Sequence, residues 1–264
     1  MKNSILVRTV CTSLAVCMFA GMAMASGSSG SSNSKETGSV TIAETTEETT
    51  TTEEAKVEYE ITNTTFLHYT NSIDNEEYVG IIEITNTGST YIYLKECTFD
   101  FEDNDGHLLQ TEKMISKSPD VIAPGEKGYF FNDGLIDDGV SLENGINLVP
   151  NFSLEIATKG AEAIIEYEVS DLDLRDGDYG GVKVTGRVTN NTTEETNHIN
   201  ATVTAIFFDS EGKILDIGYT YLDPISAGGK VSFELSTMLG NSEMSAEDVA
   251  NYVVIARHTY DFNW

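Results

Sequence analysis

The stretch INATVTAIFFDSEGKIL, residues 199–215, decides the fold class of this 264-residue chain. Apolar and polar side chains alternate along its first part, which is the pattern of a β-strand with one buried face. The side chains expected in the core are those of Ile199, Ala201, Val203, Ala205 and Phe207. Asp209–Gly212 then supplies turn residues, and a second apolar run begins at Ile214. These features predict a β-hairpin.

The same pattern occurs earlier in the chain as FDFEDNDGHLL from Phe99. Three other blocks also recur, in the same order and roughly 100 residues apart. They are VEYEITNTTFL from Val57 and IEYEVSDLDLR from Ile165, IAPGEKGYF from Ile122 and ISAGGKVSF from Ile225, and NFSLEIA from Asn151 and NYVVIAR from Asn251. A repeat of this length predicts two copies of one domain, at residues 56–160 and 161–264.

Short alternating runs separated by Gly, Pro, Asn and Asp fill both copies, and no long helical pattern interrupts them. Such a sequence predicts an all-β fold of two tandem immunoglobulin-like antiparallel β-sandwiches. The cysteine pair and core tryptophan of immunoglobulin domains are absent from the sequence, so the expected similarity is one of architecture. A capping pattern at Ser245–Asp248 indicates a helical turn before the last strand.

One strand of the first copy departs from the expected pattern. When the register of residues 199–208 is transferred to residues 91–101, the inward side chains are those of Tyr93, Lys95, Cys97, Phe99 and Phe101. A lysine is not expected in a core. Either a bulge near Lys95 resets the strand, or the start of the strand packs against another element, for which the second copy is one candidate.

The first 55 residues are expected to lie outside the fold. Lys2 and Arg8 precede an apolar run, and Ala23-Met24-Ala25 follows it, which predicts a cleaved secretory signal at residues 1–25. Lipidation of Cys17 is an alternative that the branched Val16 before it disfavours. Residues 26–55 are rich in Ser, Thr and Glu and lack aromatic residues, so they are expected to form a disordered tether. The expected location is secreted or extracytoplasmic, in loose association with a bacterial cell envelope.

Charge and cysteine content restrict the partners and the covalent chemistry. The formal net charge of −28 disfavours binding to nucleic acid and anionic lipid, and no membrane insertion is expected after signal cleavage. Loss of Cys11 and Cys17 with the signal would leave Cys97, so no intramolecular disulfide is expected. The apolar neighbours of Cys97 indicate a buried thiol rather than a nucleophile.

Three segments of the second copy resemble the FxLYD domain of bacterial secreted proteins. They are VTGRVTNNT from Val184, AIFFDSEGKIL from Ala205 and ISAGGKVSFEL from Ile225. Ala205 and Ala227 stand where the family has Phe and Pro, whereas the first copy has Phe99 and Pro124 but lacks the second Asn of the Asn-Asn pair. The resemblance implies an immunoglobulin-like β-sandwich. It implies no particular activity, because the family has none that is agreed.

No catalytic residue is predicted. Nucleophilic hydrolysis needs a base beside a nucleophile, and His68, His107, His198 and His258 stand in no such sequence context. We therefore expect a protein that is not an enzyme.

Two acidic groups could hold a cation. Asp103 and Asp105 resemble the start of a calcium loop, although Met114 stands where the bidentate Glu is expected. Asp171 and Asp173 belong to a second acidic cluster at the start of the second copy. Turn chemistry and solvation are the alternative explanation, and calcium is the one cofactor that the sequence suggests.

Tyrosines supply the candidate binding residues. Tyr219 and Tyr221 share one face of a strand, as do Tyr91 and Tyr93. Such side chains can stack on sugars or fill peptide-binding pockets, and the alternative is packing in the core or between domains. The segments 68–77, which contains Tyr69, and 116–120 are the widest insertions of the first copy, so recognition is expected there first.

The sequence favours a non-catalytic exported binding or spacer module that contacts an envelope protein or a glycan. A calcium-stabilised structural or adhesion protein is the first alternative, and an enzyme accessory domain is the second.

Overall fold

The computed structural model describes residues 56–70, 74–178, 180–193, 201–237 and 244–259. The predicted signal peptide, the tether and Ile199 lie outside these residues. Residues 55–264 form one compact unit. Its described residues form β-strands and one 3-10 turn, η1 (Gly160–Ala163), which confirms the predicted all-β class. Within the described ranges, no helix is long and apolar enough to cross a membrane.

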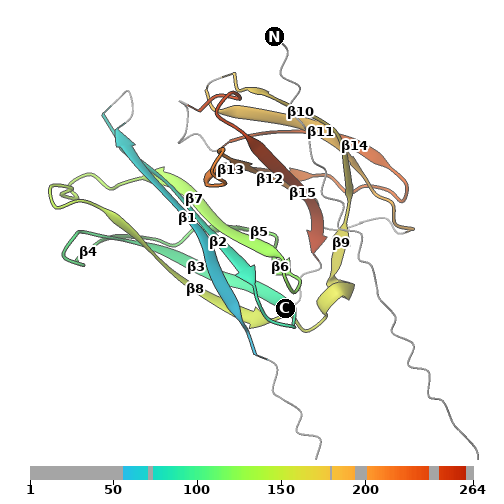
Figure 1. The fold of residues 1–264 in the computed structure, drawn as a ribbon, viewed down its shortest axis with the longest axis horizontal. Coiled ribbons are helices and arrows are strands. Elements are labelled where there is room, and N and C mark those ends of the chain that lie inside the picture. The colour runs from blue at the N-terminus through green and yellow to red at the C-terminus, as the bar shows by residue number, and fades with distance from the viewer. Residues whose placement is uncertain (1–55, 71–73, 179, 194–200, 238–243, 260–264) are drawn as a thin grey trace, which may run out of the picture. The chain divides into compact units, whose positions relative to one another are not determined.

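Four antiparallel sheets contain the strands (Figure 1). Sheet A has the order β1 (Tyr59–Thr70), β2 (Glu76–Asn86), β7 (Lys127–Leu135) and β5 (Ser116–Ser118). Sheet B has the order β4 (Leu108–Glu112), β3 (Ile92–Glu102) and β6 (Val121–Ile122), and β8 (Asn147–Ile156) also pairs with β3. Sheet C has the order β13 (Ile214–Leu222), β12 (Ala201–Phe208), β15 (Asn251–Thr259) and β9 (Ile164–Glu166). Sheet D has the order β10 (Glu168–Asp176), β11 (Val182–Thr189) and β14 (Lys230–Ser236).

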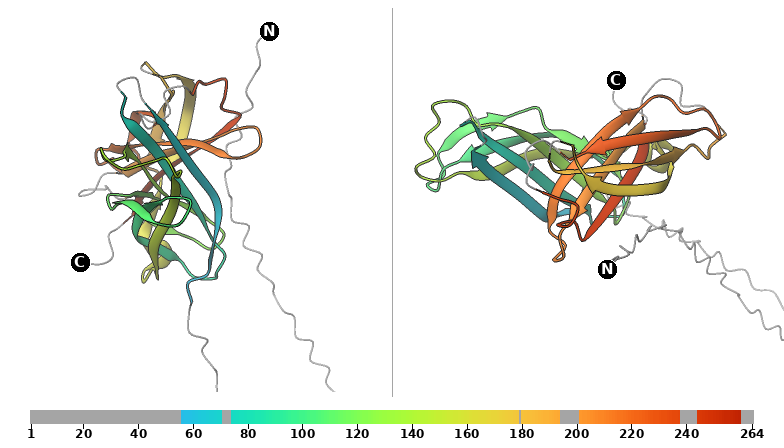
Figure 2. Two further views of the ribbon diagram at one scale, coloured as in Figure 1. Left: turned by 90° about the vertical axis from the view of Figure 1, so that its left-hand side faces the viewer. Right: turned by 90° about the horizontal axis from the view of Figure 1, so that it is seen from above.

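The sheets divide along the chain at η1. Sheets A and B use only strands before Gly160, and sheets C and D use only strands after Ala163. In both views of Figure 2, the strands coloured blue to yellow-green and those coloured yellow to red accordingly form separate sheets. This division lies at the predicted boundary, but residues 55–264 form one compact unit, so the assignment of two domains stays a prediction.

Three hydrophobic clusters hold the sheets together. One lies between sheets A and B and includes Ile82, Phe101 and Phe130. A second lies between sheets C and D and includes Val184 and Phe207. The third joins sheet A to sheet C through the side chains of Val79, Ile81, Tyr129, Phe131, Ile206, Ile214 and Ile217. The sheets are therefore layered in the order B, A, C, D.

Strand β2 is buried on both faces as a result of this layering. Every residue from Tyr78 to Ile84 is buried. Tyr78 and Ile82 belong to the cluster with sheet B, whereas Val79 and Ile81 belong to the cluster with sheet C. A strand covered on both faces loses the alternation that marks a solvent-facing strand.

A bulge at Lys95 resolves the irregular strand of the first half. The pairing of β3 with β8 shifts between Leu94 and Glu96, so Lys95 is the extra residue. Leu94 and Cys97 are consequently both buried in the cluster with sheet A, while Lys95 is exposed and pairs with Glu155. Of the two predicted explanations, the bulge is therefore confirmed.

The register predicted for β12 is correct for its described residues, but it accounts for only one face. Ala201, Val203, Ala205 and Phe207 are buried in the cluster with sheet D. Thr204 and Ile206, on the opposite face, are also buried. Sheet A covers that second face.

The repeat extends to a pair of buried asparagines. The side chain of Asn86 donates to the carbonyl of Ile122 at 3.2 Å, and that of Asn190 donates to the carbonyl of Ile225 at 2.8 Å. Each asparagine also accepts, through its own carbonyl, the backbone N–H of a turn glycine, Gly125 or Gly228. Both halves thus use one asparagine to connect two strand ends.

Two segments predicted as loops are largely strand, and the segment predicted as a helical turn forms a turn. Residues 68–70 and 76–77 continue β1 and β2, and Ser116–Ser118 forms the edge strand β5. Ser245–Asp248 forms a turn in which the Ser245 Oγ donates to the Asp248 carboxylate at 2.7 Å.

Candidate binding groove

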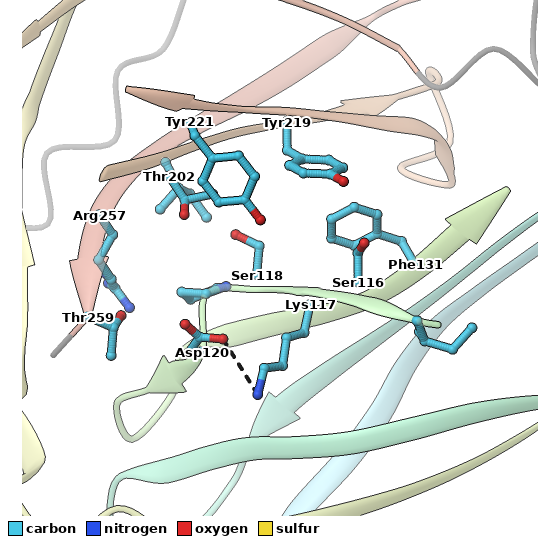
Figure 3. A pocket seen from close by; sticks show the side chains of 13 residues that line it. Ser116, Lys117, Ser118, Asp120, Phe131, Thr202, Tyr219, Tyr221, Arg257 and Thr259 are labelled. Carbon is cyan, nitrogen blue, oxygen red and sulfur yellow. Dashed lines mark ion pairs between the residues drawn. The ribbon is translucent and has the colours of Figure 1, made fainter. Parts of the chain in front are cut away.

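A groove of about 600 Å³ lies between sheets A and C, and we call it the β5–β13 groove. Its walls come from β5 and the residues around it on one side and from β12, β13 and β15 on the other (Figure 3). The groove continues the apolar contact between the two sheets, because Phe131 belongs both to that contact and to the lining of the groove. Its volume is within the range of roughly 300–1,000 Å³ that is usual for ligand sites.

Two of the predicted binding tyrosines project into the groove from β13. Successive side chains of a strand alternate between its faces, so Tyr219 and Tyr221 share one face. Their rings are 5.8 Å apart and nearly perpendicular, and Tyr219 also contacts Phe131 edge to face at 5.4 Å. Tyr219 is 38% exposed and Tyr221 is 62% exposed. Tyr219 is thus held by Phe131, whereas Tyr221 presents an accessible aromatic surface.

Uncharged hydroxyl groups surround these rings. Ser116 on β5 and Thr202 on β12 line the groove together with both tyrosines (Figure 3). Within the described part of the chain, none of these four hydroxyls has a hydrogen-bond partner. Partial burial, with Tyr219 and Asp120 nearby, raises the pKa of the Tyr221 phenol, so its hydroxyl keeps its proton and can donate. Each hydroxyl can both donate and accept a hydrogen bond.

The ammonium group of the lysine at the groove already donates to acceptors within the protein. Lys117 Nζ donates to the carbonyls of Leu94 and Lys95 and lies 4.4 Å from the ring centre of Tyr93. It also lies 3.6 Å from the carboxylate of Asp120. The positive charge of Lys117 is therefore directed toward sheet B.

The arginine at the groove is occupied in the same way. Arg257 on β15 is only 6% exposed and donates to the carbonyl of Val121 at 2.9 Å. Its guanidinium also donates to Glu126 at 2.6 Å and to Glu166 at 2.5 Å. These two carboxylates keep the pKa of Arg257 raised although burial alone lowers it. Arg257 thus connects the strand that ends the described chain to the turn before β7.

A buried hydroxyl pair lies beside the groove, and one of its members, Ser118, lines it. Ser118 Oγ on β5 and Thr204 Oγ1 on β12 lie 2.6 Å apart. This hydrogen bond joins sheets A and C directly beside Tyr219 and Tyr221. The side chains that line the groove are therefore held by contacts across both sheets.

The other predicted binding tyrosines lie outside the lining of the groove. The ring of Tyr93 makes a cation–π contact with Lys117, and Tyr91 lies against Gly160. Tyr69 donates its hydroxyl to Glu77 at 2.8 Å, and burial together with this carboxylate raises its pKa. The structure thus brings together Tyr219, Tyr221 and the segment 116–120 and leaves Tyr69 and Tyr91 elsewhere.

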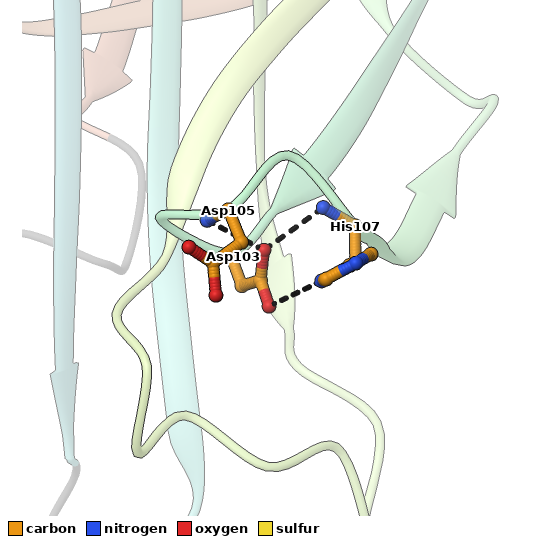
Figure 4. A group of neighbouring side chains, drawn as sticks. All are labelled: Asp103, Asp105 and His107. Carbon is orange, nitrogen blue, oxygen red and sulfur yellow. Dashed lines mark hydrogen bonds and ion pairs between the residues drawn. The ribbon is translucent and has the colours of Figure 1, made fainter.

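The predicted calcium-loop residues lie at the tip of the β3–β4 hairpin (Figure 4). Asp103, Asp105 and His107 have ligand atoms within 4.8 Å of one another. However, Asp103 Oδ1 already accepts the backbone N–H groups of Asp105 at 2.9 Å and His107 at 2.8 Å. Asn144 donates to the carboxylates of Asp103 and Asp105. These N–H donors occupy the oxygens that a cation would need, and they hold the pKa of Asp103 below its usual range.

The matching hairpin of the second half, at Asp209, forms the same turn, although no cluster of possible cation ligands is found there among the described residues. Asp209 Oδ1 accepts the N–H groups of Glu211 at 2.8 Å and Lys213 at 2.9 Å. Gly106 and Gly212 both have positive φ, as the turn requires. The repeated Asp-x-x-Gly motif therefore closes a hairpin in both halves.

The second predicted acidic pair lies on strand β10 rather than in a loop. Asp171 has a φ of 54° at a shift in the pairing of β10 with β11, and its carboxylate lies 3.4 Å from Arg187. Asp173 is exposed and pairs across the ladder with Thr185. Asp171 thus has a cation of the protein as its neighbour.

The sequence did not indicate Thr202 or Arg257 as site residues, and it indicated Ser116 only as part of the segment 116–120. Ser116 and Thr202 carry no chemical signal of their own in a chain this rich in hydroxyls. Arg257 had one signal, because it follows the inward residue Ala256 within a repeated block whose first copy has Ala157 at that place. A charged residue that replaces alanine in one copy indicates a role particular to that copy.

No protein-family model and no curated protein sequence matches the chain. The resemblance to the FxLYD domain therefore stays a prediction, and the groove is the feature of the structure that bears on function.

Proposed function

We propose that the protein is an exported, non-catalytic binding module of the bacterial cell envelope, which contacts protein or glycan through the β5–β13 groove. The observation that carries this proposal is the exposed ring of Tyr221 within a concave site of ligand size. Large aromatic side chains in well-formed concavities contribute strongly to recognition.

The lining of the groove supports binding rather than catalysis. The described lining residues include no histidine, and Lys117 and Arg257 are both engaged by protein acceptors. Hydrolysis by a serine needs a base within hydrogen-bond reach of its hydroxyl, and Ser118 Oγ instead pairs with Thr204 Oγ1.

A spacer without a ligand is the second candidate, and the contact between sheets A and C favours it. Arg257 and the Ser118–Thr204 pair fix the two halves to one another, as a stiff spacer needs. A spacer gives no reason for Tyr221 to remain exposed beside hydroxyls that lack partners among the described residues.

Co-sedimentation with salt-washed bacterial envelopes distinguishes the two candidates. The wild-type protein and the Tyr59→Ala variant are expected to sediment with the envelope, and Tyr221→Ala is expected to stay in solution. Tyr59 is the matched control because it is an exposed tyrosine on β1, outside the groove. Equal sedimentation of Tyr221→Ala and wild type, or failure of wild type to sediment, would count against the groove as the binding site.

A further inference from the structure

Many of the polar groups that line the groove are uncharged hydroxyls, which restricts the class of ligand that fits it. This step rests on the proposed function, because it concerns the same groove. The lining includes the hydroxyls of Ser116, Thr202, Tyr219, Tyr221 and Thr259, which have no hydrogen-bond partner among the described residues; they are uncharged, and each can both donate and accept. A ligand with many hydroxyl groups matches such a lining better than one whose polar groups are mainly acceptors.

Charge disfavours an anionic ligand. The net charge of the chain is −28, which repels polyanions. The two cationic side chains at the groove do not attract an anion to it, because both are already bound by groups of the protein. Lys117 donates to backbone carbonyls, and Arg257 donates to Glu126 and Glu166. Asp120 also lines the groove. A ligand that carries carboxylate, sulfate or phosphate groups would therefore find no available positive partner among the described lining residues.

The strand edges disfavour an extended peptide. A peptide that adds to a sheet needs a long run of free backbone N–H and C=O groups. On the sheet A side of the groove, the edge strand β5 has only three residues, and Pro119 follows it without an N–H group. On the sheet C side, Tyr219 and Tyr221 present a face of β13 rather than its backbone edge. The groove therefore offers side-chain contacts instead of strand pairing.

From these three features we infer that the ligand of the β5–β13 groove is a neutral glycan. Tyr221 would stack on the apolar C–H face of a sugar ring, since its own ring is the most exposed aromatic surface there. Tyr219, held by Phe131, would set the position of the adjoining sugar. The hydroxyls of Ser116 and Thr202 would bind the sugar hydroxyls from the opposite walls.

The test uses the co-sedimentation assay with envelopes that have been treated in two ways. Mild periodate cleaves the vicinal diols of sugars and leaves most protein ligands in place. Protease digestion removes protein ligands and leaves the envelope polysaccharides in place. The expected result is that periodate treatment abolishes binding of the full mature protein while protease treatment leaves it unchanged. Loss of binding after protease treatment alone, with no displacement by neutral sugars, would overturn the glycan and leave the groove as a protein-binding site.

Competition with defined sugars decides the remaining outcomes. The neutral probes are short oligomers of glucose, galactose, mannose and N-acetylglucosamine, and the neutral glycan fraction released from the same envelopes. Oligogalacturonate serves as the anionic probe. If both treatments abolish binding, displacement by the neutral fraction supports the inference and its failure to displace overturns it. Displacement by oligogalacturonate but by no neutral probe also overturns it.

Three variants separate this inference from the proposed function. Tyr221→Phe retains the stacking surface and is expected to bind within a few-fold of wild type, whereas Tyr221→Ala is expected to lose about tenfold or more in affinity. Tyr59→Ala is expected to bind like wild type. Unchanged binding of Tyr221→Ala would overturn the groove itself and therefore both proposals. A Tyr221→Ala loss, together with binding that resists periodate and that no neutral sugar probe or neutral glycan fraction displaces, overturns only the glycan. Thermal melting verifies that all three variants are folded.

Discussion

Ser118 Oγ and Thr204 Oγ1 lie 2.6 Å apart in a buried hydrogen bond that connects β5 of sheet A to β12 of sheet C. Both side chains are almost completely inaccessible. The bond thus links residues that are 86 positions apart in the sequence, beside the β5–β13 groove that Ser118 helps to line. The shape of the groove depends on this contact and on Arg257, which connects β15 of sheet C to Val121 on β6 of sheet B and to Glu126 in the turn before β7.

Removal of one hydroxyl of this pair is expected to destabilise the protein. Ser118→Ala leaves the Thr204 hydroxyl buried without its partner, which should cost about 1–3 kcal/mol in the free energy of unfolding. The double variant Ser118→Ala/Thr204→Val removes both polar groups and should cost less than the sum of the two single changes. Urea unfolding measures all three, with exposed Ser210→Ala as the control. Strict additivity of the two substitutions would contradict the contact.

The repeated asparagines give a second prediction about stability. Asn190 is completely buried and donates to the carbonyl of Ile225, whereas its neighbour Asn191 is exposed and donates to Glu168. Asn190→Ala should therefore cost about 2 kcal/mol or more, because buried polar groups lose their partner. Asn191→Ala should change the free energy of unfolding by about 0.5 kcal/mol at most. Denaturant unfolding of both variants measures the two changes in the free energy of unfolding. Equal changes for Asn190→Ala and Asn191→Ala would refute the prediction.

The β3–β4 hairpin gives a prediction about pH. Hydrogen bonds from His107, Asn144 and Asp105 hold the pKa of Asp103 well below its usual value. The contribution of Asp103 to stability is therefore complete above the pKa of an unfolded Asp, about 4, and declines as the pH falls further toward the folded-state pKa. The stability difference between wild type and Asp103→Asn should be largest at neutral pH and should shrink below about pH 4.

Chemical unfolding of both proteins across the acidic range measures this difference. Other carboxylates titrate in both proteins, so their effects cancel in the comparison. A stability difference that grows as the pH falls would mean that Asp103 is not stabilised in its ionised form.

Calcium is expected to leave the melting temperature unchanged. The Asp103 carboxylate is already saturated by N–H donors, and the same turn at Asp209 forms without a cluster of ligands. A cation that bound the folded state would raise the melting temperature. Melting of the protein with millimolar calcium and with chelator tests this, and an increase with calcium that chelator reverses would restore the metal hypothesis.

Much of the fold could be predicted because local patterns determine it. The Asp-x-x-Gly turns, the alternation along β12 and the anomaly at Lys95 are all features of single hairpins or strands. The burial of Thr204, Ile206 and the whole of β2 could not be predicted, because it results from the packing of sheet A against sheet C. No periodicity within a strand reports that its second face is covered by residues from a distant part of the chain.

The groove was predictable only in parts. Tyr219 and Tyr221 could be placed on one face of a strand, and the segment 116–120 could be recognised as an insertion. Their proximity depends on the contact between sheets A and C, which a single sequence does not encode in any local pattern. Tyr69 and Tyr91 share the same residue type and strand context, yet their surroundings differ, so residue type alone did not select the tyrosines of the groove.

The most direct test of the account is hydroxyl-radical footprinting of the mature protein, free and bound to salt-washed envelopes, with residue-level detection by mass spectrometry. Binding through the β5–β13 groove predicts that oxidation of Tyr219 and Tyr221 falls on binding, while oxidation of Tyr59 and of Met114, which is 83% exposed, is unchanged. Undiminished oxidation of Tyr219 and Tyr221 in the bound protein, or protection confined to Tyr59 and Met114, would contradict the groove as the binding site.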